Sequence, residues 1–380
     1  MKIAIPKERR TGELRVAASP DTVKKFIGLG FSVAVEAGAG SGSAVPDEAF
    51  QGAGASLAAD AKSLLADADI VLKVARPLPE EVGLMKKGAV LIANLAALVN
   101  KAEVEAYAKA GLTAFAMELV PRITRAQSMD ILSSQANLAG YRAVIDAAAV
   151  YGRGFPMMMT AAGTVAPAKA LILGAGVAGL QAIATAKRLG AVVYAYDVRA
   201  AAKEQVESLG GKFVMVDESA MKAAETSGGY AKEMGEEYKK KQAEVLADAV
   251  KKADIIICTA LIPGKPAPRL VTAEMVKGMR PGAVIVDLAV EMGGNCELSE
   301  LDQVVVKHGV TLVGHSNMAS RIAVDASTLY AKNLLNFLQP LVDKETKALK
   351  INFDDEIVKG ALVAHDGKVV HPALTGEGGQ

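Results

Sequence analysis

Residues 169–179 read KALILGAGVAG, an apolar run that leads directly into three glycines. A regular helical segment, Leu180–Leu189, follows, and a second apolar run, Ala191–Tyr196, ends at Asp197, 18 residues after Gly179. The glycine spacing alone is weak evidence. Placed between a strand and a helix, with an acidic residue at this distance, it is the fingerprint of a Rossmann dinucleotide site. We therefore predict a Rossmann-type domain centred on this turn.

The three glycines of the turn have separate physical roles. Gly174 permits the tight turn, Gly176 lets the backbone approach a pyrophosphate, and Gly179 lets the helix pack closely on the sheet. The N-terminus of the helix then offers free N–H groups and the positive end of its dipole to phosphates. The alternative is that the glycines only form a tight turn. The predicted phosphate-binding residues are Gly174, Gly176, Val177, Ala178 and Gly179.

Asp197 predicts a preference for NAD over NADP. A carboxylate at the end of the second strand accepts hydrogen bonds from the ribose hydroxyls and repels a 2′-phosphate. Arg199 argues the other way, since a nearby arginine can hold that phosphate, and we interpret it as solvated or ion-paired. The residues expected beside the ribose are Asp197, Val198 and Arg199.

Two further segments follow predicted strands at their carboxyl ends, where ligands bind in open parallel sheets. They are residues 259–264 (TALIPG) and 287–291 (DLAVE), and we expect both to line the nicotinamide side of the crevice. The glycines at 293–294 belong either to this site or to an ordinary turn. The residues expected to contact the cofactor are Thr259, Ala260 and Leu261.

Short apolar runs alternate with helical patterns along most of the chain, which indicates βαβ units and parallel sheets. A final helical pattern, Ala326–Leu338, is expected to return to the first domain. The sequence therefore predicts an α/β protein with two Rossmann-like parallel-sheet domains. The first, residues 1–135 plus 325–380, is discontinuous and completed by the C-terminal segment, and the second is residues 136–324. The expected strands are Lys2–Ile5, Ser32–Glu36, Ile70–Val74, Val90–Ala93, Thr113–Ala116, Ala170–Leu173, Val192–Tyr196, Phe213–Met215, Ile255–Cys258 and Ala283–Asp287.

Composition argues against several other classes of protein. The chain has 43 Lys and Arg against 42 Asp and Glu, a net charge of +1, which gives no electrostatic reason to expect nucleic acid or anionic lipid. The two cysteines, Cys258 and Cys296, lack metal-site spacing, so no metal is predicted. No stretch reaches the ~18–20 uninterrupted apolar residues of a membrane span. We expect a cytoplasmic protein with no direct membrane insertion.

A polar cluster precedes the helix expected at Leu132–Ala149, beside the expected domain junction. Its side chains are suited to hold an amide and a ribose by hydrogen bonds, and none forms an obvious proton-transfer dyad. The alternative is that Ser128 or Asp130 only caps the helix. His315 is interpreted as structural, because a lone histidine is more often structural than catalytic. The candidate catalytic residues are Arg122, Gln127, Asp130 and Ser133.

Segments along the whole chain resemble the alanine dehydrogenase and NAD(P) transhydrogenase superfamily. They are MKIAIPKE (1–8), ELRVA (13–17), EAGAG (36–40), VLKV (71–74) and DLAVE (287–291). Alanine dehydrogenases carry a catalytic histidine where this chain has Ala96, and an aspartate where it has Glu291. Arg15 and Lys73, which match the substrate-carboxylate ligands of that sub-family, are retained. A pocket with these cations but no histidine cannot readily run the same acid–base step.

Residues 122–135 are similar instead to the transhydrogenase loop whose Arg, Gln, Asp and Ser contact the nicotinamide nucleotide. In this sequence those positions are Arg122, Gln127, Asp130 and Ser133. Residues 219–241, with Tyr230, resemble the mobile loop of that sub-family, which closes over bound NAD(H). The resemblance implies the NAD(H)-binding component of a proton-translocating NAD(P) transhydrogenase. Hydride then passes directly between NADH and NADP, and no proton moves in that step.

The resemblance also implies partners and a location. In some members membrane helices follow on the same chain, whereas this sequence ends at Gly379-Gln380 without one. We therefore expect NADP(H)-binding and membrane-spanning subunits on other chains, a homodimer, and peripheral attachment at the inner membrane through those subunits. Two alternatives are kept: an alanine dehydrogenase-like amino-acid oxidoreductase, and a non-catalytic NADH-sensing protein.

Overall fold

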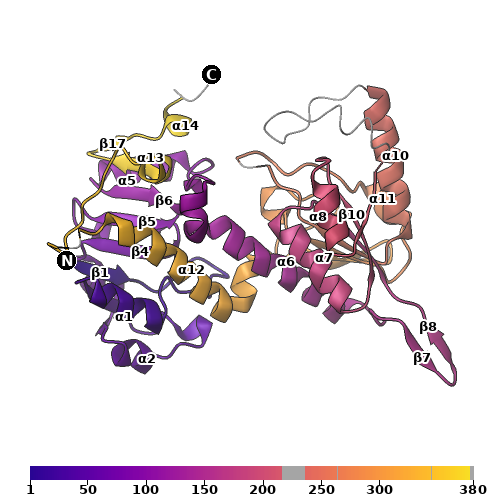
Figure 1. Cartoon of the computed structure of the whole chain (residues 1–380), viewed down its shortest axis with the longest axis horizontal. Helices are drawn as coiled ribbons and strands as arrows, with labels where there is room; N and C mark the ends of the chain where they lie inside the picture. The colour runs from indigo at the N-terminus through magenta and orange to yellow at the C-terminus, as the bar shows by residue number, and fades with distance from the viewer. Residues whose placement is uncertain (216–235, 263, 344, 377–380) are drawn as a thin grey trace. The chain divides into compact units, whose positions relative to one another are not determined.

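The chain divides into two units, which are drawn in Figure 1. Unit 1 comprises Met1–Gln135 and Ala319–Gln380, and unit 2 comprises Ala136–Met318. The helix α6 (Ile131–Val150) begins in unit 1, and most of its length belongs to unit 2. Within the 380-residue chain, the computed structural model describes residues 1–215, 236–262, 264–343 and 345–376.

Unit 1 contains an eight-stranded sheet with the order β17-β16-β6-β5-β4-β1-β2-β3. Its first six strands in sequence pair in parallel, and the C-terminal stretch adds two antiparallel strands at one edge. The C-terminal segment thus completes this sheet, as the sequence predicts. The strands are β1 (Lys2–Ile5), β2 (Ser32–Glu36), β3 (Ser56–Ala58), β4 (Ile70–Ala75), β5 (Val90–Asn94), β6 (Thr113–Ala116), β16 (Leu362–His365) and β17 (Lys368–Val369).

Both faces of this sheet are buried, because successive residues of a strand point to opposite sides. Ile3 packs in one apolar cluster with Phe26 and Phe337, and its neighbour Ala4 packs in another with Leu64. The helices of unit 1 are α1 (Pro20–Gly28), α2 (Asp47–Gly52), α3 (Ala61–Leu65), α4 (Pro79–Leu84), α5 (Lys101–Lys109), α12 (Ala323–Leu338), α13 (Glu356–Ala361) and α14 (Pro372–Thr375), with 3₁₀ turns η1 (Ser41–Ser43), η2 (Met117–Leu119), η3 (Thr124–Met129), η5 (Met318–Ile322) and η6 (Gln339–Leu341).

Unit 2 contains a seven-stranded sheet with the order β11-β10-β9-β12-β13-β15-β14, in which only β14 is antiparallel to its neighbour. The chain runs outward from β9 to β11 and then returns to β12 on the other side of β9. Ligands of such sheets bind at the carboxyl ends of the strands where the order reverses. The strands are β9 (Lys169–Leu173), β10 (Val192–Tyr196), β11 (Lys212–Phe213), β12 (Ile255–Cys258), β13 (Val284–Asp287), β14 (Val304–Lys307) and β15 (Val310–Val313).

The remaining elements of unit 2 include a separate two-stranded ribbon, β7 (Met158–Thr160) with β8 (Gly163–Val165), which extends away from the sheet in Figure 1. The sequence predicted every strand from β9 to β13 in kind. It missed β3, β7, β8 and β14 to β17, which have two to four residues each and lie at sheet edges or in the ribbon. The helices are α7 (Val177–Arg188), α8 (Ala202–Ser208), α10 (Glu236–Lys252) and α11 (Ala273–Lys277), with the turn η4 (Val290–Met292).

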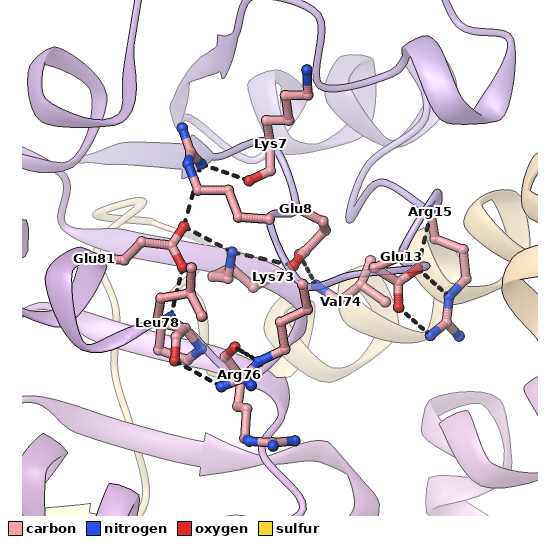
Figure 2. A network of polar contacts seen from close by, with 12 residues as sticks. Lys7, Glu8, Glu13, Arg15, Lys73, Val74, Arg76, Leu78 and Glu81 are labelled. Atoms are coloured by element: carbon pink, nitrogen blue, oxygen red, sulfur yellow. Dashed lines mark hydrogen bonds and ion pairs between the residues drawn. The ribbon is translucent and has the colours of Figure 1, made fainter. Parts of the chain in front are cut away.

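A network of buried charges lies at the end of β4 in unit 1 (Figure 2). The ammonium of Lys73, 1% exposed, lies 3.2 Å from Glu8 Oε2 and 3.1 Å from Glu81 Oε1. Glu8 Oε1 also accepts a 2.6 Å hydrogen bond from the Val74 N–H. Burial raises the pKa of Glu8, and the Lys73 charge opposes that rise. One buried cation thus neutralises two carboxylates that water does not reach.

The Lys73 network predicts a large stability effect. We expect Lys73→Met to lower the free energy of unfolding by about 3–5 kcal/mol, because it leaves buried carboxylates without their cation. The loss should shrink as the pH falls, since protonated Glu8 carries no charge that needs a partner. Urea unfolding at several pH values measures this. Lys277→Met, which breaks an exposed ion pair with Glu274, is the control and should change stability by less than about 1 kcal/mol. Equal losses in the two variants would contradict the prediction.

The turn between β9 and α7 brings two backbone segments into close contact. A Cβ added to Gly179 would overlap the carbonyl oxygen of Gly174, whereas a Cβ added to Gly176 meets nothing within 4 Å. Gly174 itself has a φ of +96°, a conformation that strongly favours glycine. The close-packing roles expected of Gly174 and Gly179 therefore have a direct geometric basis.

This difference predicts opposite outcomes for two alanine substitutions. Gly179→Ala should destabilise unit 2 by about 2 kcal/mol or more, because the clash is with backbone and cannot be relieved by a side-chain rotation. Gly176→Ala should stay within about 1 kcal/mol of wild type. Thermal and urea unfolding of the two variants in parallel compares them. The packing argument fails if Gly176→Ala is the more damaging change.

Candidate functional site

The glycine turn of unit 2 ends in the N-terminus of α7. The Leu180 N–H donates to the Gly176 carbonyl at 2.8 Å, the first bond of the helix, so the N–H groups of the three preceding residues precede that ladder. Gly176 and Val177 are exposed at this end, and no side chain caps it. Such an end is suited to an anion, since free N–H groups and the helix dipole point the same way.

Asp197 lies directly after β10, beside the turn, and its carboxylate is buried. It accepts hydrogen bonds from Ala175 N at 2.7 Å and from Arg199 N, Nε and Nη2 at 2.8, 3.0 and 3.0 Å. Burial on its own would raise the pKa of Asp197, but the bonds from Arg199 and Ala175 outweigh it and hold the pKa below its usual range. Arg199 is therefore ion-paired, one of the two states expected for it, and Val198 between them is exposed.

Thr259 fastens a third strand end to the same turn. Its hydroxyl donates to the carbonyl oxygens of Leu173 at 3.1 Å and Gly174 at 2.9 Å, and its N–H donates to Leu173 O at 2.8 Å. Ala260 follows, and the side chain of Leu261 is exposed. The structure thus brings together, at one edge of the sheet, the residues that the sequence selected after β9, β10 and β12.

The segment after β13 reaches the same edge. The Leu288 N–H donates to the Cys258 carbonyl at 3.0 Å, and the buried Asp287 carboxylate accepts from Ala289 N and Cys296 N. Gly293 and Gly294 have φ values of +97° and +82°, so they form a glycine-dependent turn. Sequence reasoning passed over the next residue, Asn295, which is fully buried and bonded to Ala260. The glycine pair was the only local signal for it.

The polar cluster of unit 1 divides into two kinds of residue. Asp130 accepts from Ser133 N at 2.8 Å and from Ser133 Oγ at 2.6 Å, so it caps the start of α6, as the capping alternative proposed. Arg122 and Gln127 are exposed, and across the described residues neither side chain makes a hydrogen bond. The adjoining turn η3 is anchored by Arg125, which pairs with Asp355. Tyr230, expected in a mobile loop, lies outside the described residues.

The positions that distinguish the two sub-families also lie in unit 1. Ala96 follows β5 with a φ of +46° and offers no ionisable group. Lys73 is engaged by Glu8 and Glu81, and the Arg15 guanidinium lies 2.7 Å from Glu13. Both cations therefore have carboxylate partners within the chain.

Two other kinds of site find no candidate in the part of the chain that the structure describes. There, no three side chains of the His, Cys, Asp and Glu types are grouped as metal ligands. Nor does any helix in those ranges have the length and apolar character that a bilayer crossing requires.

Comparisons with known proteins match both halves of the chain. Residues 4–139 match the N-terminal domain, and residues 143–372 the C-terminal domain, of the family described as alanine dehydrogenase/PNT. The NAD(P) transhydrogenase subunit alpha of Cereibacter sphaeroides is 45% identical over 98% of this chain and 71% of its own. In Rhodospirillum rubrum a separate chain, named as the first portion of that subunit, is 65% identical over the full length of both proteins.

Solved structures show the same relationship. A transhydrogenase crystal structure from Sinorhizobium meliloti is 55% identical, with a TM-score of 0.88 over 97% of this chain and 100% of that one. Alanine dehydrogenases are more distant, since the enzyme of Bacillus subtilis (strain 168) is 32% identical over 98% of this chain and 94% of its own. With both domains matched along almost its whole length, the chain belongs to the alanine dehydrogenase/PNT family.

Proposed function

We propose that this chain is the NAD(H)-binding component of a proton-translocating NAD(P) transhydrogenase. In this role it is an oxidoreductase subunit that exchanges hydride between NADH and NADP held on a partner subunit. The observation that carries the proposal is the combination of an intact dinucleotide turn with Ala96 at the position of the alanine dehydrogenase base. The similarity to transhydrogenase alpha subunits over the whole chain supports the same choice.

NAD is the proposed nucleotide because of the state of Asp197. Its lowered pKa keeps the carboxylate ionised at neutral pH, and its buried position next to the turn is the usual ribose position. Arg199, the residue best able to hold a 2′-phosphate, is already paired with that carboxylate. An NADP phosphate would have to displace this pairing and approach a negative charge, which supports discrimination against it.

The proposed reaction asks the protein for position rather than for proton transfer. Hydride transfer between two nicotinamides moves no proton, so alignment of the rings and exclusion of water supply the catalysis. Arg122 and Gln127 are exposed with their polar groups uncommitted among the described residues, which suits contact with a nucleotide or a partner. Asp130 and Ser133 are bonded to each other and are proposed to hold that loop in shape.

The main competing function is an alanine dehydrogenase-like oxidoreductase. It needs an acid–base group and free cations for a substrate carboxylate. Here Ala96 supplies no proton, and carboxylates of this chain already neutralise Arg15 and Lys73. Reconstitution with an NADP(H)-binding partner, following reduction of an NAD analogue by NADPH, tests the proposal. Oxidation of NADH by the isolated chain with pyruvate and ammonia would favour the competitor, and NADH binding without any hydride transfer would favour the sensing protein.

We also propose that the chain acts as a homodimer beside membrane-spanning partner subunits, at the cytoplasmic side of the inner membrane. The ribbon β7–β8 supports an assembly, because a two-stranded ribbon is at best marginally stable in water unless it packs against something. Its methionines Met157, Met158 and Met159 are 60%, 42% and 78% exposed. Sedimentation equilibrium, which gives the mass relative to the 39.3 kDa chain, tests the dimer.

Asp197→Asn is predicted to weaken NADH binding and relax selectivity. Loss of the charge should raise the NADH dissociation constant about tenfold, or 1.4 kcal/mol, and narrow its margin over NADPH. The stability that this carboxylate contributes is present above its unfolded pKa and is lost as the pH falls through the lower folded pKa. The stability deficit of the variant should therefore vanish in acid. Asp248→Asn, an exposed site on α10, is the control for calorimetric titrations with both nucleotides. Unchanged affinities would remove the ribose role.

Gln127→Asn is predicted to separate binding from hydride transfer. The shortened amide should slow reconstituted hydride transfer at least tenfold while the NADH dissociation constant changes less than about threefold, since positioning is lost and not the main binding contacts. Stability should be unchanged because Gln127 is exposed. Gln51→Asn, exposed on α2, makes the same chemical change elsewhere. Equal losses in binding and rate would show that Gln127 has no separate positioning role.

A further inference from the structure

Asn295 is a fully buried amide that bonds to both backbone groups of one residue. Its Oδ1 accepts from Ala260 N at 3.0 Å, and its Nδ2 donates to Ala260 O at 2.8 Å. The second Nδ2 hydrogen reaches the Pro268 carbonyl at 2.8 Å. The side chain therefore pairs with Ala260 as a neighbouring strand would, at a point where the chain has already left the sheet.

Asn295 is itself held in place by its surroundings. Its carbonyl oxygen accepts from Leu270 N at 2.8 Å and Val271 N at 3.0 Å. The next residue, Cys296, donates its N–H to the buried Asp287 carboxylate at 2.9 Å. A Cβ on the preceding residue, Gly294, would lie 2.8 Å from the same carboxylate, so only glycine allows the turn to pass so close. The amide thus acts from a fixed support at the end of β13.

Ala260 is a junction between a fixed and an exposed part of its loop. On one side, Thr259 is bonded to the glycine turn at Leu173 and Gly174. On the other, Leu261 and Ile262 are exposed, and the Leu261 N–H donates to no residue in the described part of the chain. The Asn295 amide is therefore the contact that sets the direction in which the loop leaves Ala260.

We propose that Asn295 is a positioning residue for the nicotinamide half of the bound nucleotide, acting by fixing the Ala260 peptide at the edge of the nucleotide site. This inference rests on the proposed function, because it requires that the loop after β12 contacts the cofactor. Asn295 itself touches no nucleotide in this role. Its contribution lies in holding the Ala260 N–H and carbonyl so that the exposed loop residues have one orientation.

The test uses Asn295→Asp in the full chain. The variant keeps the acceptor for Ala260 N but places a carboxylate oxygen against the carbonyls of Ala260 and Pro268, which repel it. We expect the NADH dissociation constant to rise about tenfold at pH 8. It should partly recover at pH 6, because a buried carboxyl surrounded by carbonyl oxygens takes up a proton readily and can then donate to one of them. Wild type should show no such recovery.

AMP separates a positioning role from a general loss of structure. It occupies only the adenosine and phosphate half of the site, which the glycine turn and Asp197 form, so its affinity should change less than twofold in the variant. Asn100→Asp is the matched control, since the Asn100 amide donates to a backbone carbonyl, that of Ala96, in unit 1. It should bind both ligands as wild type does. NADH affinity within twofold of wild type in Asn295→Asp, or equal weakening of NADH and AMP, would overturn the inference.

Hydrogen exchange in the wild-type chain provides a test that does not depend on the variant folding. The Ala260 amide should exchange at least tenfold more slowly than that of Leu261, because only Ala260 donates to Asn295. Equal exchange rates for the two amides would also overturn the inference. Failure of the wild-type chain to bind NADH at all would instead refute the proposed function, so the two failures are distinguishable.

Discussion

The close approach of Gly179 to the Gly174 carbonyl is the constraint on which the nucleotide edge of unit 2 depends. It sets how near α7 starts to the end of β9, and two neighbouring strands then attach to the same short turn. Asp197 bonds to the N–H of Ala175, and Thr259 bonds to the carbonyl of Gly174. Three strand ends therefore share one piece of backbone, and a shift of that turn would move a carboxylate and a loop together.

Buried charge has different consequences in the two units. In unit 1, Lys73 is withdrawn from water and neutralised by Glu8 and Glu81, so its charge is fully compensated within the fold. In unit 2, Asp197 is buried but its partner Arg199 is 42% exposed, so that pair can rearrange at a modest cost. A rearrangeable pair at the edge of a sheet suits ligand recognition, whereas a dry, closed network suits stability. The same residue types thus carry different functions because of their access to solvent.

Local patterns explain which parts of this architecture were predictable. The central strands are apolar and β-branched because both faces are buried, as in β12, and such runs are legible in sequence. Edge strands such as β14 are short and half-exposed, so their patterns resemble loops. The capping and the binding interpretations of Asp130 were both legible, since each depends on neighbours three residues away. Asn295 was not, because its partners Ala260 and Pro268 lie 35 and 27 positions away in sequence.

The proposed chemistry gives such unpredicted residues a particular weight. An enzyme that moves protons depends on a few groups with suitable pKa values, and those groups can be sought by residue type. A site that only aligns two rings depends on the rigidity of backbone segments, and a misplacement of about 1 Å can cost on the order of a hundredfold in rate. Residues that hold peptides in place, as Asn295 holds Ala260, then matter as much as residues that touch the nucleotide. The absence of an imidazole at Ala96 and the density of hydrogen bonds around the β9, β12 and β13 ends are, on this argument, two aspects of one design.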